Sequence, residues 1–263
     1  MLEQIELGLF AGALALYVVA WGWHLAGWKR ASTAHTGAAV RILWVGWLLH
    51  VAMVGLRWFR AEHVPMLSAF EFVTFFAMLV VGCFLLFALK ERNRALGVFL
   101  VPVGILLMIY AAFMPKTVEP ELTIFKGMLL QFHILTTLLG YAAWAVTFAA
   151  SICYLYLEKK EDKNPGLFDQ MAYRAAFFAF AFLTLGIITG ALWGDRVFGQ
   201  LWFWDPKETW SFITWLIFMA YLHARYTLEW RGRRAAILAI VGFAALVFTY
   251  VGVDFLLPQI HGT

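Results

Sequence analysis

Charged residues are scarce in this chain of 263 residues, which is 63% hydrophobic and only 14% charged. Together with a mean hydropathy of +0.78, this scarcity excludes an ordinary soluble globular domain and is typical of a protein that crosses a membrane several times. Cysteine is almost absent as well. Cys83 and Cys153 lie in separate apolar segments and form no Cys-x-x-Cys motif, so we expect buried structural thiols without a thiol–disulfide function.

The chain also lacks the basic residues with which a secretory signal begins. Met1 to Glu6 contains no lysine or arginine, so the first apolar segment is expected to be retained as a helix. No internal repeat or low-complexity tract stands out. The organisation of the chain therefore has to be inferred from its apolar segments and from the charges between them.

Long apolar segments dominate the sequence. A membrane-spanning helix needs about 20 mostly apolar residues, and eight segments qualify, at roughly 5–28, 38–59, 68–89, 95–114, 128–157, 172–193, 208–230 and 234–257. This pattern predicts an all-α, polytopic membrane protein with about eight transmembrane helices. Because the connections are short, residues 1–263 are expected to form a single membrane domain. The polar stretch from Glu158 to Gly166 is the best candidate for a division into a five-helix part and a three-helix part.

The net charge of +4 reflects how the basic residues are divided between the two membrane faces. If the N-terminus is external, the cytoplasmic connections hold fourteen of the 20 lysines and arginines, and the external connections hold six. The positive-inside rule then places both termini outside. The basic residues form no single patch, which argues against a nucleic-acid partner and leaves the lipid bilayer as the surroundings of the chain.

Residues 193–210, WGDRVFGQLWFWDPKETW, differ most from the rest of the chain. This aromatic segment holds six large rings, on Trp193, Phe198, Trp202, Phe203, Trp204 and Trp210. Charged residues are interleaved with them, so neither a lipid-buried helix nor a solvated loop accounts for the composition. Interfacial anchoring is one explanation, because tryptophan favours the membrane–water boundary. The other is a binding surface for a large, flat, apolar molecule with charged edges, and haem fits that description.

Local signals place the aromatic segment at a helix boundary. Residues 193–207 are expected to form an external connection. Asp205, Pro206 and Glu208 then predict the start of the seventh helix: an acidic N-cap, a proline in the first turn and a carboxylate near the positive end of the helix dipole.

Two of the seven histidines are expected on the same membrane face as the aromatic segment. His133 lies near the external end of the fifth predicted span, and His261 follows the eighth. Imidazole is the commonest axial ligand of haem iron, so this pair suggests an external bis-histidine site. The alternative is two interfacial histidines with their polar tips among lipid headgroups.

Two other histidines are candidates for a site within the membrane. His223 lies roughly 22 Å from the outer end of the seventh predicted helix at 1.5 Å per residue. An ionisable residue at that depth marks a functional site, unless it is a neutral imidazole bonded to a neighbouring helix. His24 is expected at a similar depth in the first helix and is a candidate second ligand, as is a histidine from another subunit.

The aromatic segment resembles the tryptophan-rich WWD signature of haem-handling proteins. The matching residues are Trp193, Gly199, Trp202 and the run from Trp204 to Trp210, while Phe198 stands where a third tryptophan is usual. The Asp-Pro-Lys-Glu-Thr-Trp continuation resembles the CcsA/ResC branch of cytochrome c assembly proteins, from the system II pathway. Further similarities are found at Arg57 to Glu71, Gln131 to Ala142, Tyr221 to Arg225 and Phe248 to His261.

This resemblance implies a site for haem b on the extracytoplasmic side of a bacterial plasma membrane or its equivalent. His133 and His261 would be the axial ligands there, and His223 would bind haem within the membrane. The cofactor-binding residues would also include Trp193, Phe198, Trp202, Trp204, Asp205 and, as a candidate, His24. Propionate contacts are expected from Arg57, Arg60, Arg196 and Lys207.

The resemblance also implies partners and an activity. A CcsB/ResB-like membrane protein would supply another transmembrane histidine, and the haem vinyl groups would be attached to the thiols of a Cys-x-x-Cys-His motif in apocytochrome c. The chain would then be the haem-transporting and haem-presenting subunit of a cytochrome c synthase, or haem lyase. Two alternatives stay open: a haem-handling protein without lyase activity, similar to CcmC or HemX, and a b-haem membrane electron carrier that uses His24 and His223 as a permanent pair.

Overall fold

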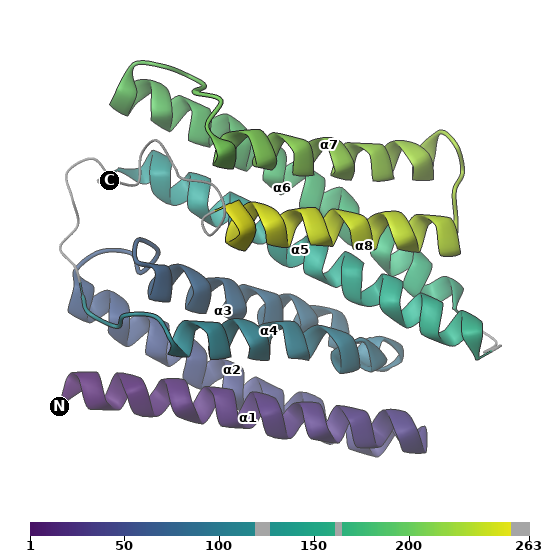
Figure 1. Ribbon diagram of the computed structural model, residues 1–263. Coiled ribbons are helices and arrows are strands. Elements are labelled where there is room, and N and C mark those ends of the chain that lie inside the picture. The colour runs from purple at the N-terminus through teal and green to yellow at the C-terminus, as the bar shows by residue number, and fades with distance from the viewer. Residues whose placement is uncertain (119–126, 161–164, 254–263) are drawn as a thin grey trace. The chain divides into compact units, whose positions relative to one another are not determined.

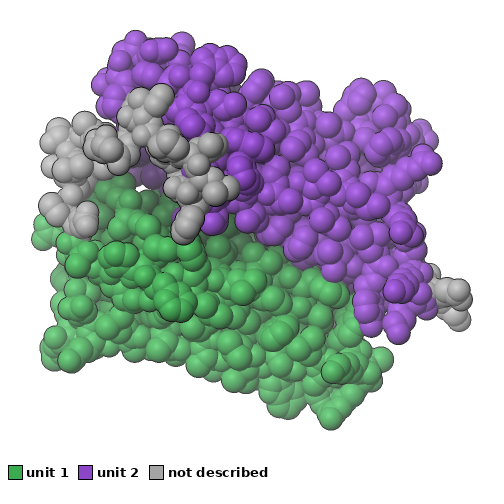
Figure 2. Space-filling model, in the orientation of Figure 1, with its two compact units in different colours: residues 1–126 green, residues 127–263 purple. Residues whose placement is uncertain are grey.

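Helices are the only regular elements in the part of the chain that the structure describes. The computed structural model describes residues 1–118, 127–160 and 165–253 (Figure 1). Two compact units divide the chain, residues 1–126 (unit 1) and residues 127–263 (unit 2), coloured green and purple in Figure 2. The division therefore falls before the fifth helix and not at residues 158–166, as the polar stretch there had suggested. The physical reason is that the fifth helix packs against the sixth and the eighth.

Unit 1 is a four-helix arrangement in which consecutive helices pack side by side and the first also packs against the fourth. Its elements are α1 (Leu2–Arg30), α2 (Thr33–Ala61), α3 (Ala69–Ala88), the 3₁₀ helix η1 (Glu91–Leu96) and α4 (Gly97–Ala112). Local caps define the helix boundaries. The Ser68 hydroxyl accepts the Glu71 N–H and the Glu71 carboxylate accepts the Ser68 N–H, which together form a capping box at the start of α3.

Unit 2 has the same neighbour relations among its own four helices. Its elements are α5 (Met128–Lys159), α6 (Gly166–Phe198), α7 (Pro206–Tyr226), α8 (Arg233–Val247) and the π-helical turn η3 (Phe248–Gly252). The α5–α6 contact is close because it is lined by glycines. A Cβ at Gly140 would lie 2.9 Å from the Leu183 backbone nitrogen, so a larger residue would push the two helices apart.

Seven helical segments of the described chain are long and apolar enough to cross a membrane. The predicted span at 208–230 corresponds to α7, which has 21 residues but does not reach the same hydropathy. Lys207, Glu208, His223 and Arg225 account for its polarity. The chain is thus an all-α integral membrane protein, and only α7 departs from the apolar composition expected of a span.

A buried ionic cluster connects three helices at one end of unit 1. Arg57 is 1% exposed; its Nε donates to Glu71 at 2.9 Å and its Nη1 to Glu6 at 3.2 Å. Arg57 also donates to the main-chain oxygens of Lys116 and Thr117, at 2.7 and 2.8 Å. Arg60 pairs with the other oxygen of Glu6. Two cations therefore face two carboxylates, and the buried charges balance.

Candidate functional site

The aromatic segment begins inside a helix. Residues 193–198 belong to α6, which ends at Gly199 with a left-handed φ of 72°. The predicted external connection of 193–207 is therefore shorter, running from Gly199 to Asp205. Hydropathy marks only the apolar part of a helix, whereas a helix continues until a residue such as glycine ends it. Figure 1 shows this connection at the same end of unit 2 as the start of α5.

The predicted start of α7 is confirmed. The Asp205 carboxylate accepts the Glu208 N–H at 2.7 Å, and Pro206 occupies the first turn. The Glu208 carboxylate in turn accepts the Phe203 N–H at 2.7 Å. These two bonds hold the connection in a tight loop. Trp204 lies between them with a left-handed φ of 56°, a conformation that costs free energy in a residue other than glycine.

The rings of the aromatic segment contact one another edge to face. One group joins Trp193 to Phe198 and Phe198 to Phe203, at centroid distances of 5.7 and 5.6 Å. A second group is centred on Trp202, which lies 5.9 Å from Trp204 and 6.2 Å from Phe212 of α7. Such T-shaped pairs are a favourable geometry for aromatic rings. They orient these rings relative to one another in the absence of a ligand.

Part of this aromatic surface faces outward. Trp204 is 68% exposed and Phe198 is 44% exposed. The indole nitrogen of Trp202 is buried and has no hydrogen-bond partner among the described residues. A buried N–H without an acceptor costs free energy, so it calls for an acceptor that these residues do not supply.

His133 of α5 is held by the backbone of α6. Its Nδ1–H donates to the Gly186 carbonyl oxygen at 2.7 Å. A carbonyl oxygen only accepts, so the ring proton of the neutral imidazole is on Nδ1 and the lone pair is on Nε2. This is the arrangement in which a histidine binds a metal through Nε2 while its other nitrogen is anchored by a backbone oxygen.

Glycine spacing on α6 makes room for this imidazole. Gly186, Gly190 and Gly194 recur at every fourth residue, and a Cβ at Gly190 would lie 2.7 Å from both Nδ1 and Cε1 of His133. The ring therefore rests directly on the backbone of α6. These glycines were not among the residues predicted from the sequence, although their four-residue spacing is typical of close helix packing in membranes.

The structure places the two candidates for an intramembrane site in very different surroundings. His223 is exposed on α7, where its Nδ1 lies 3.3 Å from the Thr227 hydroxyl. His24 belongs to unit 1 and is fully buried, with Phe84 edge-on at a centroid distance of 5.3 Å. Neither ring nitrogen of His24 has a hydrogen-bond partner within the described part of the chain. Within the described residues, the His223 imidazole therefore makes one long hydrogen bond through Nδ1, and the His24 imidazole makes none.

The arginines predicted to contact the haem propionates differ in how exposed their side chains are. Arg57 and Arg60 had been expected to contact propionates, but both are paired with Glu6 in unit 1 and Arg57 is fully enclosed, so this expectation was wrong for Arg57. The reason is that the carboxylates that neutralise Arg57 come from other helices. Arg196 is exposed at the end of α6. His261, the second predicted ligand of the external site, lies outside the described residues.

Both thiols are free and lie within helices, Cys83 in α3 and Cys153 in α5. His50 in α2 is buried and shares a hydrogen bond of 3.0 Å with the Tyr17 hydroxyl. Both observations fit structural roles within the two units.

Fold and site together define a polytopic helical membrane protein with an aromatic, histidine-flanked surface at one end of unit 2. A family model described as "Cytochrome C assembly protein" matches residues 66–261, three quarters of the chain. This range includes His133, the aromatic segment and His223, whereas His24 lies before it.

Similar proteins agree with this match. The cytochrome c biogenesis protein CcsA of Gloeobacter violaceus is 30% identical over 327 residues, covering 98% of this chain and 95% of that protein. CcsA of Chlamydomonas reinhardtii is 32% identical over 228 residues, and the chain spans only 65% of its length. Among solved structures, the cytochrome c haem lyase CcmF has the same fold, with a TM-score of 0.76 at 18% identity, over 95% of this chain and 47% of that one. The chain belongs to the cytochrome c assembly protein family and is of the CcsA type.

Proposed function

We propose that this chain binds haem at the aromatic end of unit 2 and presents it for covalent attachment to apocytochrome c. The observation that carries the proposal is the hydrogen bond of His133, which determines which ring nitrogen is free. Its Nδ1 is committed to the Gly186 carbonyl, so Nε2 is the ring nitrogen left to bind iron. Membership of the cytochrome c assembly family supports the same reading.

The residues of the aromatic segment fit a haem. The exposed rings of Phe198 and Trp204 offer apolar faces on which a porphyrin would pack. The Trp202 indole N–H, which lacks an acceptor among the described side chains and main chain, would donate to a carboxylate oxygen at the haem edge. Arg196 and Lys207 are the proposed cations near the propionates. At an exposed rim such pairs contribute little free energy, so they would orient the ligand more than hold it.

Bound haem supplies the vinyl groups that react with the two thiols of a Cys-x-x-Cys-His motif. The chain itself positions that reaction. His133 and, by the sequence expectation, His261 would occupy the two axial positions of haem b, and the histidine of the apocytochrome would replace one of them. The capped loop between α6 and α7 would keep the aromatic rings in place meanwhile, because Asp205 and Glu208 fix its backbone where it enters α7.

A second haem position, within the membrane, is proposed at His223. The exposure of this side chain on α7 leaves it open to a ligand held between this chain and a neighbouring helix. The second axial ligand would come from a CcsB/ResB-like partner, with His24 as the candidate within this chain. We further propose that the whole chain acts as one membrane domain, with both termini and the aromatic segment on the extracytoplasmic side.

Spectroscopy of histidine variants tests the external site. The chain would be co-purified with a CcsB-like partner, and its haem measured by pyridine haemochrome in the wild type and in His133→Ala, His261→Ala and the double variant. The double variant is expected to lose the b-type spectrum of the external site and the attachment of haem to a Cys-x-x-Cys-His reporter. His35→Ala is the matched control, because His35 lies beside the turn between α1 and α2, where it bonds to Ser32 and Arg30 and its ring lies 5.3 Å from that of Trp23.

An unchanged haem spectrum together with normal cytochrome c maturation in the double variant would refute the proposal. Haem binding by the wild type without covalent attachment to the reporter would instead favour a haem-handling protein without lyase activity. Tightly bound haem that exchanges electrons with quinol, without maturation, would favour the electron-carrier alternative.

A further inference from the structure

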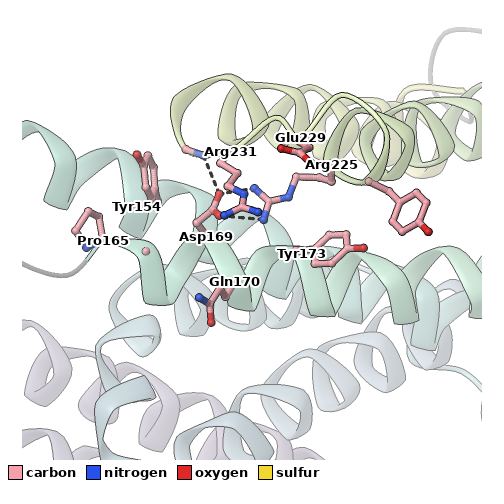
Figure 3. Close-up of a pocket in the computed structure, with 11 residues that line it drawn as sticks. Tyr154, Pro165, Asp169, Gln170, Tyr173, Arg225, Glu229 and Arg231 are labelled. Carbon is pink, nitrogen blue, oxygen red and sulfur yellow. Dashed lines mark hydrogen bonds and ion pairs between the residues drawn. The ribbon is translucent and has the colours of Figure 1, made fainter.

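A polar pocket of about 630 Å³ lies at the end of unit 2 opposite the aromatic segment. The start of α6, the end of α7 and the connection to α8 enclose it (Figure 3). Its floor is an ion pair: the Asp169 carboxylate accepts both terminal nitrogens of Arg225, at 2.6 and 2.9 Å. Asp169 also accepts the Gly232 N–H at 2.9 Å. Three donors therefore bind this carboxylate, and Arg225 balances its charge.

A second arginine enters the same pocket without a carboxylate of its own. Figure 3 shows Arg231 reaching toward the pair formed by Asp169 and Arg225. Within the described ranges Arg231 forms no hydrogen bond or ion pair, not even with Glu229, which also lines the pocket. Arg233 and Arg234 are exposed in the first turn of α8, directly beyond the pocket.

The charges around the pocket do not balance. Arg225 and Arg231 line the pocket together with Asp169 and Glu229. Arg233 and Arg234 follow in the first turn of α8, and Glu158 accepts a hydrogen bond from the lining Tyr154, so four arginines lie near three carboxylates and leave an excess of one positive charge. One of those carboxylates, Asp169, is already paired with Arg225. Guanidinium groups match the geometry of oxyanions such as phosphate, so an anion at Arg231 would restore the balance.

The depth of the pocket indicates where that anion comes from. α6 is apolar enough to span a membrane and begins at Gly166, which itself lines the pocket, so the pocket opens where lipid headgroups lie. Tyr226, 82% exposed, lines the pocket, and Leu228, 54% exposed, follows it in the chain. An exposed tyrosine and leucine beside a basic pocket are suited to the boundary between headgroups and acyl chains. A soluble anion has no acyl chains, so this apolar rim would not stabilise its binding.

We infer that this pocket binds the phosphate group of an anionic phospholipid, with Arg231 as the contact that selects the charge. Arg225 and Asp169 have a separate part: they pin the connection between α7 and α8 onto α6 and so shape the pocket. Basic pockets at helix ends are a known means by which membrane proteins hold anionic headgroups. The site stands apart from the proposed haem function, because no residue of the aromatic segment takes part.

Lipid titration of the full-length protein tests this inference. Binding of phosphatidylglycerol and of phosphatidylcholine with the same acyl chains would be followed by native mass spectrometry, with inorganic phosphate as a separate ligand. Arg231→Gln is expected to weaken phosphatidylglycerol binding by about fivefold, the effect of one arginine near a charged surface. Arg174→Gln is the matched control: Arg174 is exposed on α6 next to Tyr173 but does not line the pocket. Thermal unfolding of both variants shows whether each is folded.

The expected result is a preference for phosphatidylglycerol over phosphatidylcholine that Arg231→Gln removes and Arg174→Gln keeps. Equal binding of the two lipids would overturn the inference, as would an Arg231→Gln variant with unchanged affinity. Saturable binding of inorganic phosphate in place of the lipid would assign the pocket to a soluble oxyanion. Loss of haem with no change in lipid binding would assign Arg231 to a haem carboxylate. Each of these last two results would overturn the lipid assignment.

Discussion

Replacing Gly190 with alanine is expected to weaken haem binding without touching the haem itself. A Cβ at this position would lie 2.7 Å from both Nδ1 and Cε1 of His133. Atoms of this kind pack at about 3.5–4.0 Å. The imidazole must therefore move by roughly 0.8 Å or more, which is the difference between the two distances. Because α6 and α5 are in close contact, the ring has to move away from the α6 backbone.

The displacement acts on the anchor of His133. The Nδ1–H bond to Gly186 is 2.7 Å long, and a shift of this size would stretch it to about 3.5 Å, the limit of a hydrogen bond. A bond of this kind contributes about 0.5–1.5 kcal/mol to stability. Losing the backbone partner of a metal-binding histidine typically lowers affinity by about 10- to 100-fold. We expect a loss in that range for haem at the external site.

Haem titration of the apoprotein, followed by the Soret band, measures this effect. Gly194→Ala is the matched control, because it adds the same methyl group one turn further along α6. The nearest atoms to a Cβ there are the Gln200 oxygen at 3.5 Å and Phe203 Cε2 at 3.9 Å, which are ordinary contacts. Gly194→Ala should bind haem as the wild type does. Adding Gly190→Ala to His133→Ala should cause no further loss, since both changes act on one ligand.

Two results would refute this reasoning. One is wild-type haem affinity in Gly190→Ala, which would mean that the position of the His133 ring does not matter. The other is an additional loss of affinity when Gly190→Ala is combined with His133→Ala, which would mean that the glycine acts through general packing of α5 on α6.

Two further predictions concern the elements that hold the two units. Asp205→Ala is expected to destabilise unit 2 by about 0.5–2 kcal/mol through loss of the α7 N-cap. Asp205→Asn keeps the cap and should unfold near the wild-type temperature. Equal losses of stability in both variants would mean that the negative charge of Asp205, and not its hydrogen bond to the helix, stabilises unit 2. Arg57→Ala is expected to cost about 3–5 kcal/mol because it leaves Glu71 buried without a cation and takes away one of the two cations that Glu6 faces. Thermal unfolding in detergent measures this loss, with Arg41→Ala, at an exposed position on α2, as the control. An Arg57→Ala variant as stable as this control would show that the ionic cluster does not stabilise the protein.

Most of the helices could be predicted because an apolar run of sufficient length has few alternatives in a membrane. The predicted span 68–89 and α3 (Ala69–Ala88) agree almost residue for residue. The predicted span 172–193 is shorter than α6 (Gly166–Phe198) at both ends. Asp195 and Arg196 broke the apolar run, but charged side chains on an exposed turn do not end a helix; the left-handed Gly199 does.

The packing arrangement of the helices was harder to predict from the sequence. The polar stretch near residue 160 suggested a boundary, yet α5 packs against α6 and α8. Each unit has the same neighbour relations although no internal repeat stands out in the sequence. The contact between α5 and α6 depends on small residues such as Gly140 and Gly186, whose effect appears only when the facing helix is known.

The sequence by itself determined that this is a helical membrane protein, where its aromatic segment lies, how α7 begins and which histidines are candidate ligands. These properties follow from composition and from residues close together along the chain. Only the tertiary structure decided that His133 is anchored by Gly186, that Arg57 forms ion pairs with Glu6 and Glu71, and that Arg231 has no carboxylate of its own. The physical reason is that hydrogen bonds and ion pairs act over about 3 Å, so the state of each polar side chain depends on which distant helix folds against it.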